Sequence, residues 1–304
     1  MFYRIRNKIK KGWFDAWCAP VLRAPPIKPV DDHVVILSAV GNQDILMYLV
    51  AIKSFYHFFK RGRIVVLIQD SCPRANLEVL SHHVNPTRIL RDSDVDLGRC
   101  PGSGAWGWER LVAVVSEAER SYVIQLDSDT VTVADVPEVK ECVNANRSFT
   151  IGTWSNQEIE PMRQSCDRVR NAEGSHVQLV AERNFDKLPG FETYRYARGQ
   201  SSFTGFARGS CSLRALEQFS EQMEGIIGQP KWSEWGSESV ASNFVIANSP
   251  DACVLPYPKY ATYRPKGDTA ATKYAHSSLI HFEGTYRFKH GIYVRSARRT
   301  IALL

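Results

Sequence analysis

The stretch SYVIQLDSDTVTVADVPEV, residues 121–139, holds the pattern from which the fold class and the chemistry are predicted. Its apolar run VIQL has the character of a buried strand, and it leads directly into Asp127 and Asp129 on either side of Ser128. A single aspartate after a strand is usually a turn former or a helix cap. Two like charges at a partly buried strand end are costly unless a cation compensates them. Magnesium and manganese take such oxygen ligands, so the pair predicts a divalent metal site.

Short apolar runs alternate with amphipathic segments on both sides of this stretch. Buried strands are predicted at residues 33–40 and 63–70, and helices at residues 43–59 and 108–119. Strands that are apolar on both faces and alternate with helices predict an α/β fold with a mostly parallel central sheet flanked by helices. Ligands in such sheets bind beyond the carboxyl ends of the strands, which is where the aspartate pair lies.

The second half of the chain is less regular. Strand character returns at residues 148–155 and 201–210, and helical spacing at residues 211–227 and 235–249. The polar stretch at residues 156–199 is longer than most structureless loops, and we expect long loops and small helices there.

The composition is that of a globular protein with a sizeable core, at 304 residues of which 44% are hydrophobic and 23% charged. The seven cysteines form no CxxC pair, and their odd number favours a reducing compartment over a disulfide framework. No apolar run approaches the roughly 20 residues needed to cross a bilayer, so a cytoplasmic location is expected. The net charge of +6 favours anionic partners such as nucleotide phosphates or an acidic membrane surface, and no nucleic acid is expected.

Positive charge is concentrated in the first 17 residues, MFYRIRNKIKKGWFDAW, which carry five cations against the single Asp15. Apolar residues recur there at intervals of three and four, as on one face of a helix: Phe2, Ile5, Ile9, Trp13 and Trp17. Such a stripe is typical of a helix lying on a membrane surface, and equally of a terminal helix that packs on the protein's own body. The four prolines between residues 20 and 29 then predict an extended tether.

Four motifs together carry a resemblance to a known family. In chain order they are WERLVAVVSEAERSYVIQLDSDTVTVADVPEV, SSFTGFARGS, WGSESVASNFVIA and LIHFEGTYRFKHG. Their order resembles nucleotide-sugar-dependent glycosyltransferases of the GT-A fold, nearest to family 8, from about residue 33 to residue 293. With the basic segment and tether predicted at residues 1–30, the resemblance implies a single catalytic domain at 31–304. Within that domain, residues 31–140 would bind the nucleotide sugar and residues 141–304 the acceptor.

The resemblance gives the aspartate pair a role. Asp127 and Asp129 would bind manganese, or magnesium, that bridges the two phosphates of the donor, with Ser128 against the substrate. The family's third protein ligand is a histidine in a late HxxGxxK motif, and His281 of HFEGTYR matches it, with Gly284 following. The neutral imidazole also suits manganese on chemical grounds.

The last position of that motif departs from the family. Arg287 stands where the family usually has lysine, and it keeps the charge. An arginine fork can hold a phosphate through two hydrogen bonds, so Arg287 is the candidate that stabilises the leaving diphosphate. If the register of the motif shifts, Lys289 takes this role.

Other positions are candidate substrate contacts. Arg110 of WERL occupies the place of an arginine that contacts the donor in the family. In SFTGF, Thr204 stands where the family has asparagine, followed by Gly205. In WGSES, Glu238 stands where the family often has aspartate, and Ser239 replaces a glutamine. Glu238 is the second candidate catalytic residue.

The turn after the first predicted strand, AVGNQD, offers a further contact. It would place Ala39, Val40 and Gly41 against the nucleotide, although a small residue and a glycine before a helix are also ordinary loop chemistry.

The sequence thus predicts a metal-dependent glycosyltransferase that moves a sugar from a nucleotide diphosphate, expected to be a UDP-sugar, to a hydroxyl of a glycan or glycolipid. A metal with an arginine or lysine neutralises the charge that grows on the leaving diphosphate. Family 8 implies retention of configuration, whereas Glu238 as a general base would give inversion. Peripheral contact with the anionic inner face of a membrane is also expected.

Three alternative functions share features with this pattern, of which the sequence argues against a nucleotidyltransferase. LDSDTVTV resembles the DxDxT motif of haloacid-dehalogenase-type phosphatases, although that motif normally ends the first strand of its fold. A sugar nucleotidyltransferase would carry a glycine-rich loop with arginine after the first strand, which AVGNQDIL lacks. A nucleotide-sugar-binding protein with a degenerate site is the third alternative, because the acceptor motifs depart from the family.

Overall fold

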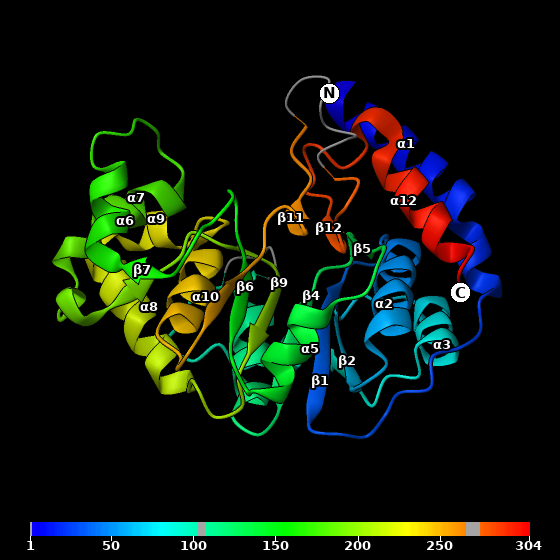
Figure 1. The fold of residues 1–304 in the computed structure, drawn as a ribbon, viewed down its shortest axis with the longest axis horizontal. Helices are drawn as coiled ribbons and strands as arrows, with labels where there is room; N and C mark the ends of the chain where they lie inside the picture. The colour runs from blue at the N-terminus through cyan, green and yellow to red at the C-terminus, as the bar shows by residue number, and fades with distance from the viewer. Residues whose placement is uncertain (1, 103–106, 266–273) are drawn as a thin grey trace. The chain divides into compact units, whose positions relative to one another are not determined.

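The structure, a computed structural model, describes residues 2–102, 107–265 and 274–304, so Met1 lies outside it. These residues form two compact units (Figure 1). Unit 1 comprises the described residues within 2–90, 126–140 and 258–304, and unit 2 those within 91–125 and 141–257.

The central sheet confirms the predicted α/β fold. Its seven strands run in the order β10-β6-β9-β4-β1-β2-β3. Neighbours β1 and β2 are parallel, as are β10 and β6, whereas β6 and β9 are antiparallel, so the sheet is mixed. The residues of β1 and β2 are almost all buried because apolar side chains cover both faces, as in sheets flanked by helices.

Unit 1 contains two of the predicted strands, the long apolar helix between them and the helices of both chain ends. Its elements, of which β3 and α5 extend past its boundaries at Leu90 and Lys140, are α1 (Phe2–Cys18), η1 (Ala19–Arg23), β1 (Val34–Val40), α2 (Ile45–Phe59), β2 (Arg63–Ile68), α3 (Arg74–His83), β3 (Arg88–Arg91), β5 (Thr130–Thr132), α5 (Pro137–Asn144), β11 (Tyr260–Thr262), β12 (Leu279–His281), η5 (Lys289–Gly291) and α12 (Ile292–Ile301).

A small second sheet in unit 1 joins segments that are far apart in the sequence. Its three strands run in the order β11-β12-β5. Strand β12 is parallel to β11 and antiparallel to β5, and its register sets His281 opposite Thr130. The amide of Phe282 also donates to the carbonyl of Asp129, at 2.9 Å. This pairing brings the late histidine motif beside the aspartate pair.

Helix α1 packs against α12 and α2 through one face and leaves another exposed (Figure 1). Phe14 and Cys18 are fully buried, and the ring of Phe14 lies 4.3 Å from that of Tyr293 in α12. The stripe residues behave differently: 58% of Ile9, 67% of Trp13 and 48% of Trp17 are exposed. The side chains of Phe2 and Ile5 lie outside the described part. Phe14 and Cys18, which do not belong to the predicted stripe, therefore hold the helix on the body, whereas Ile9, Trp13 and Trp17 of the stripe face outward.

The proline-rich segment after α1 lies along the body of unit 1. The buried ammonium of Lys53 in α2 donates to the carbonyls of Ala24 and Pro25, at 2.8 and 2.9 Å. Farther along, the amide of Ile27 donates to the carbonyl of His83, and the amide of Val30 to the hydroxyl of Tyr56. Among the described helices, none has the length and apolar composition required to cross a membrane.

Unit 2 contains the remaining strands of the central sheet and a cluster of short helices. The polar stretch predicted as long loops and small helices forms α6, α7, two 3-10 turns and a two-stranded ladder. The elements of unit 2 are η2 (Asp92–Asp94), α4 (Gly107–Ala118), β4 (Tyr122–Leu126), β6 (Phe149–Ile151), β7 (Glu160–Pro161), α6 (Met162–Val169), α7 (Val177–Arg183), η3 (Phe185–Lys187), η4 (Phe191–Thr193), β8 (Arg195–Tyr196), β9 (Gln200–Phe206), α8 (Leu213–Ile227), α9 (Gln229–Trp232), α10 (Ser237–Ala247) and β10 (Cys253–Leu255).

Candidate metal centre

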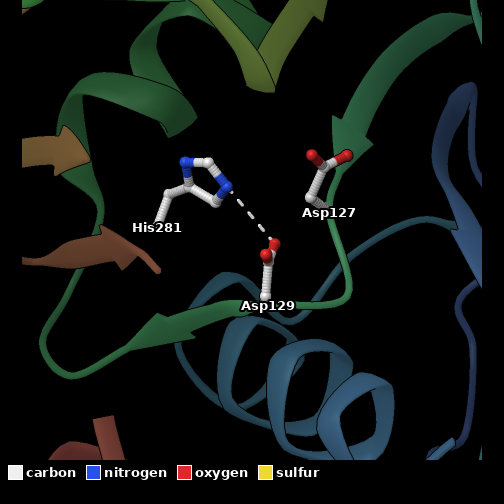
Figure 2. Close-up of side chains that lie close together, drawn as sticks. All are labelled: Asp127, Asp129 and His281. Atoms are coloured by element: carbon white, nitrogen blue, oxygen red, sulfur yellow. Dashed lines mark ion pairs between the residues drawn. The ribbon is translucent and has the colours of Figure 1, made fainter. Parts of the chain in front are cut away.

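Asp127, Asp129 and His281 come together in unit 1, with one potential ligand atom of each within 4.8 Å of the others (Figure 2). Asp127 follows the last residue of β4, and its carbonyl accepts hydrogen bonds from the amide and hydroxyl of Thr130, at 3.2 and 2.9 Å. These bonds close a tight turn through Ser128 that leads into β5. His281 is the last residue of β12, so the small sheet supplies the third side chain of the group.

The imidazole of His281 is held by a partner on each nitrogen. Its Nδ1 lies 3.1 Å from the hydroxyl of Thr262 in β11, and its Nε2 lies 3.3 Å from Oδ1 of Asp129. Proteins orient histidine ligands in this way, by engaging the nitrogen that does not face the metal. Thr262 was not found from the sequence, because a threonine in a short strand carries no signal of such a role.

Arg287 balances the charge of Asp129. Its Nη2 lies 2.5 Å from Oδ2 of Asp129, and its Nε donates to the carbonyl of Phe282 at 3.1 Å. Burial alone would raise the pKa of Asp129, but Arg287 and His281 outweigh burial and hold that pKa well below its usual range. Burial would lower the pKa of His281, but the nearby Asp129 carboxylate outweighs it and raises that pKa above the ordinary value of 6.5.

The three side chains fit a divalent cation. Two carboxylates offer hard oxygen atoms and the imidazole offers a borderline nitrogen, a mixed set that fits a divalent transition-metal ion such as manganese better than magnesium. Asp129 is only 6% exposed, and a buried carboxylate in such a place requires a cationic partner. In the structure Arg287 and His281 provide that positive charge.

A cavity of about 830 Å³ opens in unit 1 beside this group, within the size range of small-molecule sites. Its walls come from residues 41–44 after β1, from Gln69 after β2, from the loop after β12 and from α1. Arg287 lines the cavity and also contacts Asp129, so it connects the two. Gly284 lines it as well, with no described atom within 4 Å of the position a Cβ would take.

Of the other predicted positions in unit 1, one lines this cavity and the rest do not. Gly41 lines it directly, whereas Ala39 is half-buried and Val40 buried in β1 behind it. Lys289 is exposed, and its ammonium lies 4.7 Å from the centre of the Tyr286 ring. Of the two candidate cations in the histidine motif, Arg287 is therefore the one that contacts the metal group.

The predicted polar residues of unit 2 form a network of their own. Arg110 approaches the hydroxyl of Ser201 at 3.4 Å, and that hydroxyl lies 2.6 Å from the hydroxyl of Ser239. Ser239 in turn donates to Glu238, which also accepts from the amide of Gly236 at 2.8 Å. Glu238 is buried at the start of α10. The network connects three predicted motifs, and the roles of Arg110 and Glu238 stay predictions.

Thr204 and Gly205 are buried in β9. A Cβ on Gly205 would lie 2.3 Å from the ring of Phe149 and 2.5 Å from the hydroxyl of Tyr122, so packing requires glycine there. Their predicted contact with substrate stays a prediction, and the structure gives Gly205 a packing role.

Comparisons by sequence find no matching family model and no matching curated protein. Solved structures do match. The galactosyltransferase LgtC, in complex with donor and acceptor sugar analogues, has 11% identity and a TM-score of 0.53 over 89% of this chain and 96% of that chain. The chain has the GT-A glycosyltransferase fold. An active-site mutant of LgtC matches with a TM-score of 0.54.

The bifunctional glycosyltransferase WbbM matches this GT-A fold as well, with 14% identity and a TM-score of 0.52. The match covers 91% of this chain but 51% of WbbM, so the chain spans about half of that protein. The predicted resemblance to GT-A glycosyltransferases is thereby confirmed at the level of the fold, and the chemistry rests on the residues of the site.

The ion pair between His281 and Asp129 predicts how the stability of the metal-free protein changes with pH. Because the pKa of folded His281 is raised, its contribution is complete below the ordinary value of 6.5 and is lost as pH rises through the higher value. The lowered pKa of Asp129 keeps its own contribution throughout this range. Each unit by which folding raises the histidine pKa is worth about 1.4 kcal/mol.

We therefore expect the melting temperature of chelator-treated protein to fall as the pH rises above the ordinary histidine pKa of 6.5, and His281→Gln to remove much of that fall. His33→Gln, at an exposed position, is the matched control and should keep the wild-type slope. An unchanged slope in His281→Gln would show that the pair does not stabilise the fold.

Proposed function

We propose that the protein is a metal-dependent glycosyltransferase that moves a sugar from a nucleotide diphosphate, with a UDP-sugar as the expected donor, to a hydroxyl of a glycan or glycolipid. The observation that carries the proposal is that Asp127, Asp129 and His281 converge, and that Arg287, which contacts Asp129, lines a cavity. The GT-A fold supports it, because LgtC with this fold has been solved with donor and acceptor sugar analogues.

Asp127, Asp129 and His281 would hold the manganese or magnesium ion, with Thr262 fixing the imidazole. When bound, the ion neutralises negative charge on the diphosphate as the bond to the sugar breaks. The chain adds Arg287, which competes with a metal for the same carboxylate of Asp129. Arg287 would then turn its guanidinium toward the phosphates in the cavity that it lines and stabilise the leaving group.

The nucleotide would lie against the loop after β1, where Gly41 lines the cavity. In unit 2, Arg110 is the proposed additional donor contact. Glu238 is proposed to orient the acceptor hydroxyl, or to take its proton if the reaction inverts configuration. Retention of configuration and transfer of a hexose follow from the resemblance to family 8 and belong to the same proposal.

The fold favours the glycosyltransferase over one of the two alternative functions and does not separate it from the other. The match to LgtC covers most of both chains and favours the glycosyltransferase over the DxDxT phosphatase. A nucleotide-sugar-binding protein with a degenerate site would share the fold and the metal group. It differs in turnover alone, so a measurement of turnover separates the two.

The test is a screen of nucleotide sugars with manganese, measuring release of nucleoside diphosphate. Asp127→Asn, Asp129→Asn and His281→Gln should each lower turnover by about a hundredfold or more, the size of loss seen when a main charge-stabilising group is removed. Asp135→Asn removes a more exposed carboxylate from the same stretch of sequence and should keep activity. Full activity of Asp129→Asn after chelation would overturn the metal assignment, and nucleotide binding without turnover would favour the binding protein.

We propose further that the enzyme docks on an anionic membrane surface through α1 and α12. Ile9, Trp13 and Trp17 are exposed on α1, and the guanidinium of Arg298 in α12 lies 4.5 Å from the ring of Trp17. Exposed tryptophans among basic residues suit the interface between lipid headgroups and water. Each cation near an anionic surface is worth about 1 kcal/mol, and the attraction falls off within a Debye length.

This surface can be tested without disturbing the packed face of α1. Ile9→Ser combined with Trp13→Ala should weaken binding to vesicles containing anionic lipid and leave the melting temperature close to that of wild type, because both side chains are mostly exposed. Trp235→Ala is the matched control, since Trp235 is also 67% exposed and lies in unit 2. Equal vesicle binding by the double variant and the wild type would refute the docking.

A further inference from the structure

Helix α1 presents two lysines to the cavity beside the metal group. Lys8 and Lys11 both line it, and residues three apart lie on one face of a helix. We propose that these lysines bind the phosphates of the nucleoside diphosphate, so that α1 forms a wall of the donor site. This inference rests on the proposed function and adds to it a binding element from a segment for which the sequence predicts attachment to a membrane surface or packing on the protein's own body.

The charges around the cavity favour an anionic ligand. The described residues that line it include three cationic side chains and one carboxylate: Lys8, Lys11, Arg287 and Asp44. Burial raises the pKa of Asp44, while Arg287 and Lys11 act in the opposite direction. A cavity with cations supplied both by α1 and by the loop after β12 offers a diphosphate more than one charge-assisted contact.

Lys11 is held in position before any ligand arrives. Its side chain is 17% exposed, and its ammonium lies 2.9 and 2.8 Å from the two carboxylate oxygens of Asp15, one turn along the helix. Asp15 thus restrains the lysine and also competes with a phosphate for the same ammonium group. The ion pair provides a way to separate a binding role of Lys11 from a role in the stability of α1.

The helix itself is fixed to the segment that carries the metal ligand. The ring of Phe14 lies 4.3 Å from that of Tyr293 and 6.1 Å from that of Phe288, which also lines the cavity. Tyr293 stacks on Phe282 at 4.4 Å, and Phe282 directly follows His281. One aromatic cluster therefore holds both α1 and the loop with Arg287, which gives Lys8 and Lys11 a defined place relative to the proposed phosphate site.

The experiment is calorimetric titration of the full chain with UDP in the presence of manganese, with GDP as a second nucleotide. Lys11→Gln should weaken binding roughly tenfold, as expected for loss of a hydrogen bond to a charged group, and Lys8→Gln combined with it should weaken binding further. Lys11→Arg should keep most of the affinity. Asp15→Asn should strengthen binding, because it removes the carboxylate that competes for Lys11.

Lys10→Gln is the matched control, because Lys10 lies on the same helix but lines a separate apolar hollow with Ile9 and Trp13. It removes the same charge and should leave the dissociation constant close to that of wild type. If Lys11→Gln and Lys10→Gln bind UDP as tightly as wild type while Asp129→Asn does not, α1 has no part in the site and the proposed function stands. If wild type binds neither UDP nor GDP, the inference and the proposed function both fail.

Discussion

The buried charge of Asp129 is the constraint on which the site depends. A carboxylate at this position needs a cation, and the chain supplies Arg287 and His281 from a segment far away in the sequence. Their approach requires the small sheet, whose register places His281 opposite Thr130, directly after Asp129. The same carboxylate is one of the proposed ligands of a divalent metal. In the metal-free protein Arg287 pairs with the carboxylate of Asp129, and in the proposed reaction a metal would take the place of Arg287 on that carboxylate.

Helix α1 has three faces with different surroundings. Phe14 and Cys18 pack on the body, Ile9 and Trp13 are exposed, and Lys11 lines the cavity. A membrane surface that held the exposed face would therefore act on a helix that also forms part of the proposed donor site. Attachment and donor binding are in this view physically connected, because a single rigid helix carries the residues for both.

The sequence predicted β1, β2, β4, β6 and β9 of the central sheet and the helices beside them, because buried strands and helices leave strong periodic patterns, and it placed the aspartate pair at the end of β4. It did not predict β5 or β11, two short strands of the small sheet, because β5 follows the aspartate turn directly and β11 lies in an irregular part of the chain. The second partner of His281, Thr262, was missed for the same reason. That Arg287 contacts Asp129 could not be predicted either, because the contact depends on the turn after β12, which the sequence pattern does not determine. The buried and the exposed face of α1 could not be told apart from the sequence. Phe14 lies next to Trp13, and an aromatic stripe alone does not indicate which side of a helix is buried.

The most direct measurement is a crystal structure with manganese and UDP, using anomalous scattering to locate the metal. We expect one manganese ion bound by Asp127, Asp129 and His281, with Arg287 moved from Asp129 to a phosphate oxygen. A structure in which Arg287 still pairs with Asp129, and manganese and UDP lie elsewhere, would contradict the metal centre and the function proposed from it.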